Sequence, residues 1–248
     1  MSRVYAEVAN TYEHGFEMPF RKYFELASVL QILGSVEGLS VLEVGCGTGH
    51  YSRLIRKAGA LRVAGVDISE EMIQIGRDLE HHAPLGVEYI VRDVGALEYV
   101  GSFDVVLGVY LLHYARSQEH LWKMCQNIAL NLKPGGRFIS YHTNPDFARE
   151  PADYYLPYGF QPHDLEHLED GGVYALSIDA EGFTAPKIPV YYWSKASYEA
   201  AFAAAGLTVR GWYVGGPSPE GISAHGHKFW EPMLKHPYSI FVECLKQQ

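Results

Sequence analysis

The chain has few cysteines, no long apolar run and no concentration of positive charge. Its three cysteines among 248 residues form neither a paired framework nor a C-x-x-C metal motif, which fits a reducing compartment. No apolar run approaches the roughly 20 residues that span a bilayer. The first residues have polar and acidic breaks where a signal peptide would be continuously apolar. We therefore expect a soluble, cytoplasmic protein with no membrane partner.

Charge and histidine spacing narrow the function further. Twenty Lys and Arg against 29 Asp and Glu give a net charge of −9, and no basic run stands out. Nucleic-acid binding draws much of its affinity from Lys and Arg at phosphates, so this balance disfavours a nucleic-acid partner. The 12 histidines include no H-E-x-x-H arrangement, and no metal is expected.

The most informative segment is the run SVLEVGCGTG at 40–49. It has the pattern of a buried strand that enters a glycine-rich turn, with helix-like sequence following from His50 to Ala58. Glycines let the backbone approach a ligand where a Cβ would collide, and the N–H groups at a helix start favour negative groups. This pattern predicts a nucleoside-like ligand at the end of a first strand. The dinucleotide fingerprint G-x-G-x-x-G would need glycine at the place of His50.

Strand-like and helix-like segments alternate over residues 41–142, which predicts βαβ units and a parallel sheet. Before them, Pro19–Leu33 has the pattern of an amphipathic helix that covers the sheet or closes over the site. Ser69 is a plausible N-cap for a helix to Leu79, and Ser117–Leu132 is a second clear helix.

The pattern changes after Tyr141. Residues 144–193 show poor periodicity and many aromatic side chains, and an irregular segment of that length is usually functional. We interpret it as a cap inserted before a helix at Ser194–Ala205. Two last strands are expected at Leu207–Val214 and Tyr238–Leu245, with a short helix at His227–Leu234 between them.

Five motifs in order carry a resemblance to a known family. Glu43 precedes the G-x-G-x-G turn, and two further strand-like runs, LRVAGVD and VEYIVRD, end in Asp67 and Asp93. FDVVLGV at 103–109 and LKPGGRFIS at 132–140 follow. The series resembles class I S-adenosylmethionine (SAM)-dependent methyltransferases, most specifically over residues 40–142.

The resemblance implies a fold as well as a function. It implies a Rossmann-like α/β fold whose seven-stranded, mostly parallel sheet has the order 3-2-1-4-5-7-6, with helices on both faces. We expect one domain, 1–248, made of a helical lid (1–38), a SAM-binding core (39–142), a substrate cap (143–193) and a final helix with two strands (194–248).

The resemblance also implies SAM as cofactor and S-adenosylhomocysteine (SAH) as product. Asp67 would accept hydrogen bonds from both ribose hydroxyls, Asp93 would accept from the adenine amine, and Arg21 would meet the SAM carboxylate. Arg21 is also consistent with a solvated helix face, and Ile68 and Met72 with ordinary core packing. The implied cofactor-binding residues are Tyr12, Arg21, Glu43, Gly45, Cys46, Gly47, Gly49, Asp67, Ile68, Met72, Asp93, Val94 and Gly108.

Methyl transfer from a sulfonium is an in-line displacement, so the protein mainly has to position the reactants. A base of near-neutral pKa helps where the acceptor loses a proton, and His113 and His142 are the candidates. Aromatic density with few basic residues favours a flat aromatic or heteroaromatic acceptor. The same aromatic residues are also consistent with a small core of their own. The candidate acceptor-binding residues are Tyr5, Tyr110, Tyr141, Asn144, Tyr158, Tyr191, Trp193 and Trp230.

Among such enzymes, the resemblance suggests small-molecule methyltransferases of bacterial secondary metabolism, including those that methylate nitrogen in toxoflavin-like azapteridines. The partner is then a small-molecule acceptor, and the protein a monomer or homodimer. Two other functions stay open. A nicotinamide-dependent oxidoreductase would also use Asp67 for a ribose, although His50 opposes it, and a SAM-binding module without turnover would keep the same motifs.

Overall fold

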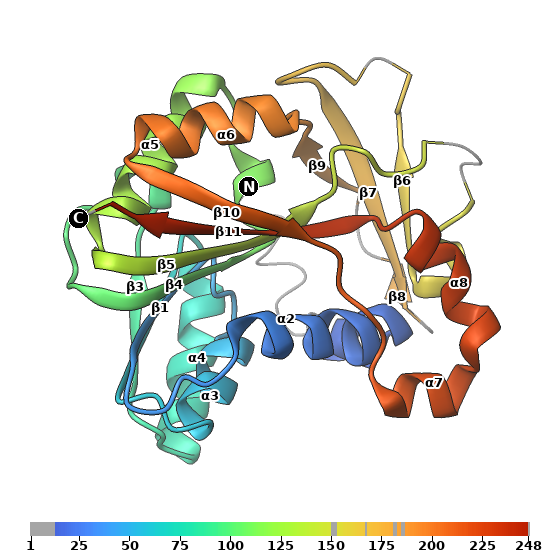
Figure 1. Cartoon of the computed structure of the whole chain (residues 1–248). Helices are drawn as coiled ribbons and strands as arrows, with labels where there is room; N and C mark the ends of the chain where they lie inside the picture. The colour runs from blue at the N-terminus through green and yellow to red at the C-terminus, as the bar shows by residue number, and fades with distance from the viewer. Residues whose placement is uncertain (1–12, 150–152, 167, 181–182, 185–186, 248) are drawn as a thin grey trace.

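The computed structural model describes residues 13–149, 153–166, 168–180, 183–184 and 187–247. Its central feature is a twisted seven-stranded sheet, shown in Figure 1, with the strand order β10-β11-β5-β4-β1-β2-β3. The strands are β1 (Ser40–Val44), β2 (Arg62–Asp67), β3 (Val87–Val91), β4 (Phe103–Val109), β5 (Leu132–Thr143), β10 (Leu207–Tyr213) and β11 (Ser239–Lys246).

The five strands from β1 to β5 are parallel, and β11 is antiparallel to both β5 and β10. Counted within this sheet alone, the strands run 3-2-1-4-5-7-6 from the β3 edge. The carboxyl ends of the parallel strands meet along one edge, where ligands bind in open α/β sheets.

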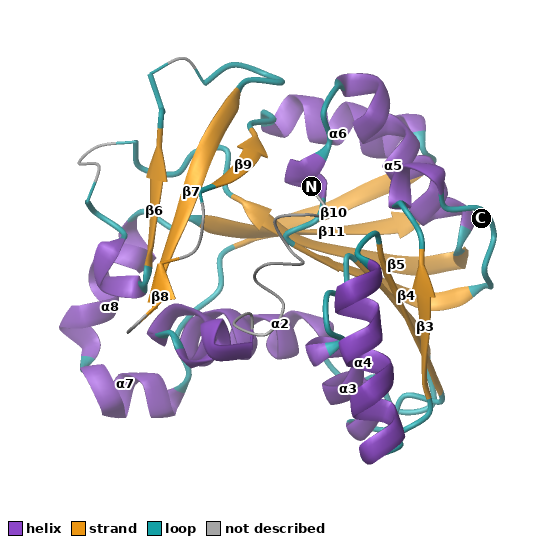
Figure 2. Ribbon diagram, turned by 180° about the vertical axis from the view of Figure 1, so that it is seen from behind, coloured by secondary structure: helices purple, strands orange, loops and turns teal. Residues whose placement is uncertain are grey.

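Helices cover both faces of the sheet. In Figure 1, α5 and α6 lie above it and α2, α3 and α4 below it, and the view from behind in Figure 2 shows the same two layers. These helices are α2 (Leu26–Leu33), α3 (His50–Lys57), α4 (Glu70–His82), α5 (Gln118–Leu130) and α6 (Lys195–Ala204). The expected mostly parallel α/β fold with helices on both faces is confirmed.

Serine side chains start three of these helices. The hydroxyls of Ser69, Ser117 and Ser194 accept hydrogen bonds from backbone N–H groups three residues later, which satisfies donors that a helix start leaves free. The predicted N-cap at Ser69 is confirmed, and the helix continues to His82 rather than Leu79.

The expected helix at 19–33 is divided into two geometries. It begins with a short π-helical segment, η2 (Phe20–Glu25), and continues as α2. π-Helical turns are rare and are often found at functional sites. A 3-10 turn, η1 (Glu13–Glu17), precedes it, and the other single turns are η3 (Val94–Ala96), η4 (Leu112–Tyr114) and η5 (Leu156–Tyr158).

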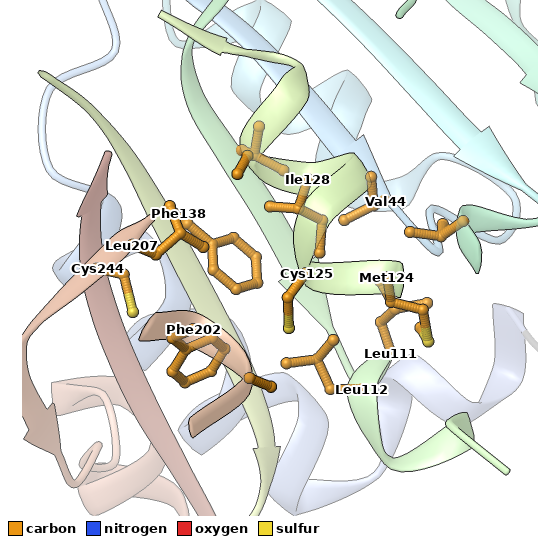
Figure 3. Packing of buried hydrophobic residues seen from close by; sticks show 14 of the residues in the cluster. Val44, Leu111, Leu112, Met124, Cys125, Ile128, Phe138, Phe202, Leu207 and Cys244 are labelled. Carbon is orange, nitrogen blue, oxygen red and sulfur yellow. The ribbon is translucent and has the colours of Figure 1, made fainter. Parts of the chain in front are cut away.

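The core beneath α5 and α6 is a large cluster of buried apolar side chains. Figure 3 shows side chains from β1, β5, β10 and β11 meeting those of the two helices. Phe138 and Phe202 pack edge to face with their ring centroids 6.0 Å apart. Because this core fixes both the strands and the turn after β4, it sets where the strand ends lie.

Residues 144–193 contain a second, smaller sheet, which the sequence analysis did not predict. Its strands are β6 (Phe160–His163), β7 (Val173–Ala180), β8 (Phe183–Thr184) and β9 (Ile188–Tyr191). All its pairings are antiparallel, and β7 pairs with each of the other three. The strands β6, β8 and β9 have 4, 2 and 4 residues, which is too few to show a clear alternation of apolar and polar side chains. Figure 1 places this sheet beyond the strand ends of the large one.

The link between β10 and β11 also differs from expectation. It contains two helices, α7 (Pro219–His225) and α8 (His227–Lys235), where one was predicted. Ser218 caps α7 by accepting from Gly221 N at 3.1 Å, and Pro219 occupies the first helical position. None of the helices in the described ranges is long and apolar enough to cross a membrane.

Candidate functional site

A cavity of about 190 Å³ lies at the carboxyl ends of β1, β2 and β4, next to the second sheet. Most of its wall comes from the glycine turn and the loops after β2 and β3, the turn after β4, the helical segment η2, and the second sheet. The helix α5, the end of β5 and the residue before β11 complete it. Segments more than 200 residues apart in the sequence therefore meet here, since Met18 and Tyr238 both line it.

The glycine turn adopts a backbone that other residues rarely take. Gly45, Gly47 and Gly49 have φ angles of 72°, 54° and 84°. At Gly49, which precedes the first turn of α3, a Cβ would lie 2.0 Å from the hydroxyl of Tyr89 on β3. Glycine is therefore required there both for the turn and for the packing of α3 against the sheet.

Asp67 and the glycine turn form one hydrogen-bonded unit. Asp67 ends β2, and its Oδ2 accepts from Gly47 N at 2.8 Å while its Oδ1 accepts from Ser69 N at 2.9 Å. Burial raises the pKa of Asp67, and these backbone N–H groups oppose that rise. Gly45, Gly47 and Asp67 all line the cavity. The structure thus brings together three residues that the sequence analysis assigned from two separate motifs.

The outer end of the cavity lies beyond Asp67. Ile68, Met72, Asp93 and Val94, all predicted to bind cofactor, line it together. Asp93 caps η3 through Oδ1, which accepts from Gly95 N at 2.8 Å. Three basic side chains that the sequence analysis did not select also line this end: Arg92, Arg116 and His120.

The other half of the cavity is mostly apolar. Its apolar wall comes from the residues before and within η2, from the turn after β4, and from the second sheet: Met18, Phe20, Leu111, Phe160, Leu176, Ile178 and Ile188. Polar side chains interrupt this wall, among them Tyr110, His113, Thr143 and Tyr238. A mostly apolar pocket with a few placed polar groups is typical of a site for a small organic molecule.

His113 connects these polar groups. It is only 3% exposed, and burial lowers the pKa of its imidazole to about 3, so the ring is neutral at neutral pH. Its Nδ1 lies 3.4 Å from Thr143 Oγ1, which also accepts from the Tyr174 hydroxyl at 3.0 Å. The Tyr174 and Tyr238 hydroxyls are 3.2 Å apart. A polar chain thus runs from the turn after β4 to the second sheet.

A buried ion pair closes the cavity on the side of η2. Arg21 Nε donates to Glu25 Oε1 at 3.3 Å, and the hydroxyl of Tyr51 on α3 donates to the same oxygen at 2.7 Å. The Arg21 guanidinium also lies over the Phe16 ring, 3.7 Å from its centroid. Both Arg21 and Glu25 line the cavity. Arg21 was predicted from the sequence and Glu25 was not, although an acid one turn later on an apolar helix was a usable signal.

Four residues predicted to bind the cofactor are not in the cavity wall: Glu43, Cys46, Gly49 and Gly108. Glu43 points into the interior behind the turn, where it is 1% exposed and accepts from Ser52 Oγ. Burial raises the pKa of Glu43 to about 8. Gly108 pairs with Val44 and Ser140 inside the sheet, and the wall is formed by the next residue of β4.

The structure places His142 on the opposite face of the sheet from the cavity. Its ring packs against Tyr198 and Trp212, and its Nδ1 is 2.9 Å from Ser140 Oγ. Successive side chains of a strand point to opposite faces, so Thr143 reaches the cavity and His142 does not. The Tyr141 side chain lies on the same face of the sheet as the cavity, but it is fully buried and stacks on Phe241.

The large aromatic residues of the expected cap also lie outside the cavity. Tyr158 stacks on Trp230 with ring centroids 5.8 Å apart, and its hydroxyl donates to Phe229 O at 2.7 Å. Trp193 Nε1 donates to Ala115 O at 3.1 Å within the core under α5 and α6. These side chains therefore belong to the two main cores of the protein, because bulky aromatic groups gain most from full burial. A small separate core within the expected cap is formed instead by Tyr174, Ile188 and Val190.

The remaining acceptor-binding predictions divide in the same way. Asn144 is buried and donates from Nδ2 to Pro237 O at 2.9 Å, and Tyr191 on β9 packs against the core under α5 and α6. Tyr110 lines the cavity. Tyr5 and Tyr12 lie outside the described residues.

Comparisons with known proteins agree with this geometry. A family model described as a methyltransferase domain matches residues 41–136. The chain is 32% identical over 114 residues to a ubiquinone biosynthesis O-methyltransferase of Coxiella burnetii, an alignment covering 46% of this chain and 47% of that protein. It is 33% identical over 124 residues to a demethylmenaquinone methyltransferase of Lactococcus lactis, covering 48% and 47%. The chain thus spans about half the length of these curated relatives.

Similarity of fold extends over nearly the whole chain. A crystal structure of a S-adenosylmethionine-dependent methyltransferase from Mesorhizobium loti superposes with a TM-score of 0.65. It covers 93% of this chain and 99% of its own, at 19% sequence identity. At that identity the comparison establishes the fold, including the part beyond the matched domain.

Proposed function

We propose that this chain is a class I SAM-dependent methyltransferase that transfers a methyl group from SAM to nitrogen or oxygen of a small planar metabolite. The observation that carries the proposal is the unit formed by Asp67 and the glycine turn at the cavity wall. The mostly apolar half of the cavity next to it supplies room for an acceptor.

The residues present fit the cofactor. Each oxygen of the Asp67 carboxylate accepts one backbone N–H group, and each retains a further lone pair for a ribose hydroxyl. A side chain at Gly45 would approach Leu111 to 3.1 Å, so glycine keeps this part of the wall open. At the outer end of the cavity, Asp93 would accept a hydrogen bond from the adenine amine. The adenine ring would lie between Ile68 and Met72.

The protein contributes position and surroundings to the reaction. SAM, when bound, supplies a methyl group already activated by a positive sulfur. Apolar side chains from η2 and the second sheet exclude water from the adjoining space. Placing the reactants in line can contribute roughly 7–11 kcal/mol in favourable cases.

His113 has a defined part in this proposal. Because burial holds its pKa at about 3, its imidazole is neutral and can accept a hydrogen bond from an acceptor O–H or N–H. The same low pKa makes it a weak proton acceptor, since general bases work best near the ambient pH. We therefore assign His113 to orienting the acceptor.

The acceptor class follows from the wall of the inner half. Its apolar side chains and its few hydrogen-bonding groups suit a flat ring carrying one or two polar substituents. Relatives named for ubiquinone and menaquinone biosynthesis support an aromatic acceptor. We propose that residues 143–193, through β6, β7 and β9, form the acceptor side of the site.

Calorimetry tests the cofactor. We expect SAH to bind and NAD not to bind, because position 50 is histidine where the dinucleotide motif has glycine. Binding of NAD without SAH would replace the proposal with an oxidoreductase.

Turnover is tested by SAH release with a panel of catechols, hydroxyquinones and nitrogen heterocycles. Substituting His113→Asn should lower kcat/KM by about three- to tenfold if it makes one neutral hydrogen bond. Loss of a general base would instead cost about 100-fold or more. His142→Asn is the matched control, and SAH binding without any turnover would favour a SAM-binding module.

A further inference from the structure

We propose that Glu25 binds the α-ammonium of the cofactor, so that Arg21 and Glu25 on one helical turn recognise the two charges of its amino-acid end. This inference rests on the proposed function and assigns that end of the ligand to the segment η2. It gives Glu25 a role in binding in addition to its ion pair with Arg21.

Glu25 has one satisfied and one unsatisfied carboxylate oxygen. The side chain is fully buried, and Oε1 accepts from Arg21 Nε and from the Tyr51 hydroxyl. Oε2 is also buried and has no hydrogen-bond partner in the described part of the chain. Because Glu25 lines the cavity, the missing donor has to come from a molecule that occupies it.

The chemistry of that donor follows from the charge. A carboxylate oxygen kept from water is strongly unfavourable unless a donor reaches it, and a charged donor satisfies it best. The cofactor's amino-acid end carries both an ammonium and a carboxylate. Arg21 can pair with the carboxylate and Glu25 with the ammonium, so a zwitterion matches this pair without leaving net charge buried.

Position ties Glu25 to the cofactor rather than to the acceptor. Tyr51, which holds Glu25 at 2.7 Å, is the second residue of α3, and α3 starts at the glycine turn. The other carboxylates among the described cavity residues, Asp67 and Asp93, each accept from backbone N–H groups. Glu43 lies behind the turn and outside the wall. Glu25 is therefore the acid best placed for an ammonium group.

The experiment compares three ligands by calorimetry on the full chain. SAH carries both charges, decarboxylated SAH keeps only the ammonium, and methylthioadenosine has neither. Glu25→Gln should weaken SAH and decarboxylated SAH by about 10- to 100-fold, the worth of one charge-assisted hydrogen bond. Its affinity for methylthioadenosine should not change. Glu17→Gln, which removes an exposed acid from the same end of the chain, is the matched control and should leave all three affinities unchanged.

Each other outcome overturns the assignment. Equal weakening of all three ligands would show that Glu25 only supports the fold of η2, and unchanged SAH affinity would show that the ammonium lies elsewhere. If Glu25→Gln fails to fold, the wild-type protein is tested with SAH and with deaminated SAH, which lacks the ammonium. Deaminated SAH that binds as tightly as SAH would refute the proposal. Failure of the wild-type protein to bind either SAH or methylthioadenosine would instead refute the proposed function itself.

Discussion

Glu43 should make the protein less stable as the pH rises. It lies in β1, an interior strand between β4 and β2, and is 1% exposed, with Asp67 nearby and one hydrogen bond from Ser52. Burial is the main reason that its pKa rises from 4.5 to about 8. Between these values the folded protein holds a proton that the unfolded chain has released, so the free energy of unfolding falls with increasing pH.

The size of this effect follows from the shift. One pKa unit corresponds to about 1.4 kcal/mol, so a rise from 4.5 to about 8 amounts to a loss on the order of 4 kcal/mol when the pH rises from about 5 to above 8. Glu43→Gln removes the titrating group and keeps an oxygen for Ser52. Its unfolding free energy should therefore stay flatter over this range and exceed that of the wild type at high pH.

Urea unfolding at a series of pH values measures this directly. Glu98→Gln removes an exposed acid and serves as the control for net charge. We expect the difference between Glu43→Gln and wild type to grow steadily from pH 5 to above pH 8. Parallel curves for the two proteins would refute the claim that Glu43 is held protonated by burial.

Three further substitutions test the site and its surroundings. Asp67→Ala should weaken SAH by about 100-fold or more, because it removes two charge-assisted hydrogen bonds to the ribose, and methylthioadenosine should weaken equally by calorimetry. Gly49→Ala should lower the free energy of unfolding, measured by urea unfolding, by about 2–5 kcal/mol, because of the positive φ at this position and the collision of the new Cβ with Tyr89. In a Tyr89→Ala background the collision is absent, and the loss should fall to about 1–2 kcal/mol. His142→Ala should cost about 2–4 kcal/mol of stability from lost packing and leave SAH affinity unchanged; weaker SAH binding would contradict its placement on the far face.

Much of the cofactor side of the site could be predicted from the sequence. The turn at Gly45, Gly47 and Gly49 requires backbone angles that only glycine takes easily. Asp67 ends the buried strand β2, and Asp93 comes two residues after the edge strand β3. Parallel strands bring their carboxyl ends to one edge of the sheet. Acids at the ends of neighbouring strands therefore lie close together whenever the connecting helices have ordinary lengths. The predicted assembly of these residues needed no knowledge of distant contacts.

The acceptor side was decided by tertiary structure. A one-residue difference in strand phase separates Thr143 in the cavity from His142 on the far face, and the aromatic residues of the expected cap carry no mark that distinguishes a core from a site. Glu25 matters only because η2 lies against Tyr51, which is 26 residues away.

Local sequence determined the turn, the helix caps and the order of strands and helices over residues 41–142, since these depend on dihedral preferences and periodicity within a few residues. Only packing between distant segments decided which polar side chains face the cavity and which lose water without gaining a partner. Burial and hydrogen bonding belong to the whole fold, and for this reason Asp67, Asp93 and Arg21 could be selected from the sequence, while Glu25 and the apolar half of the cavity required the structure.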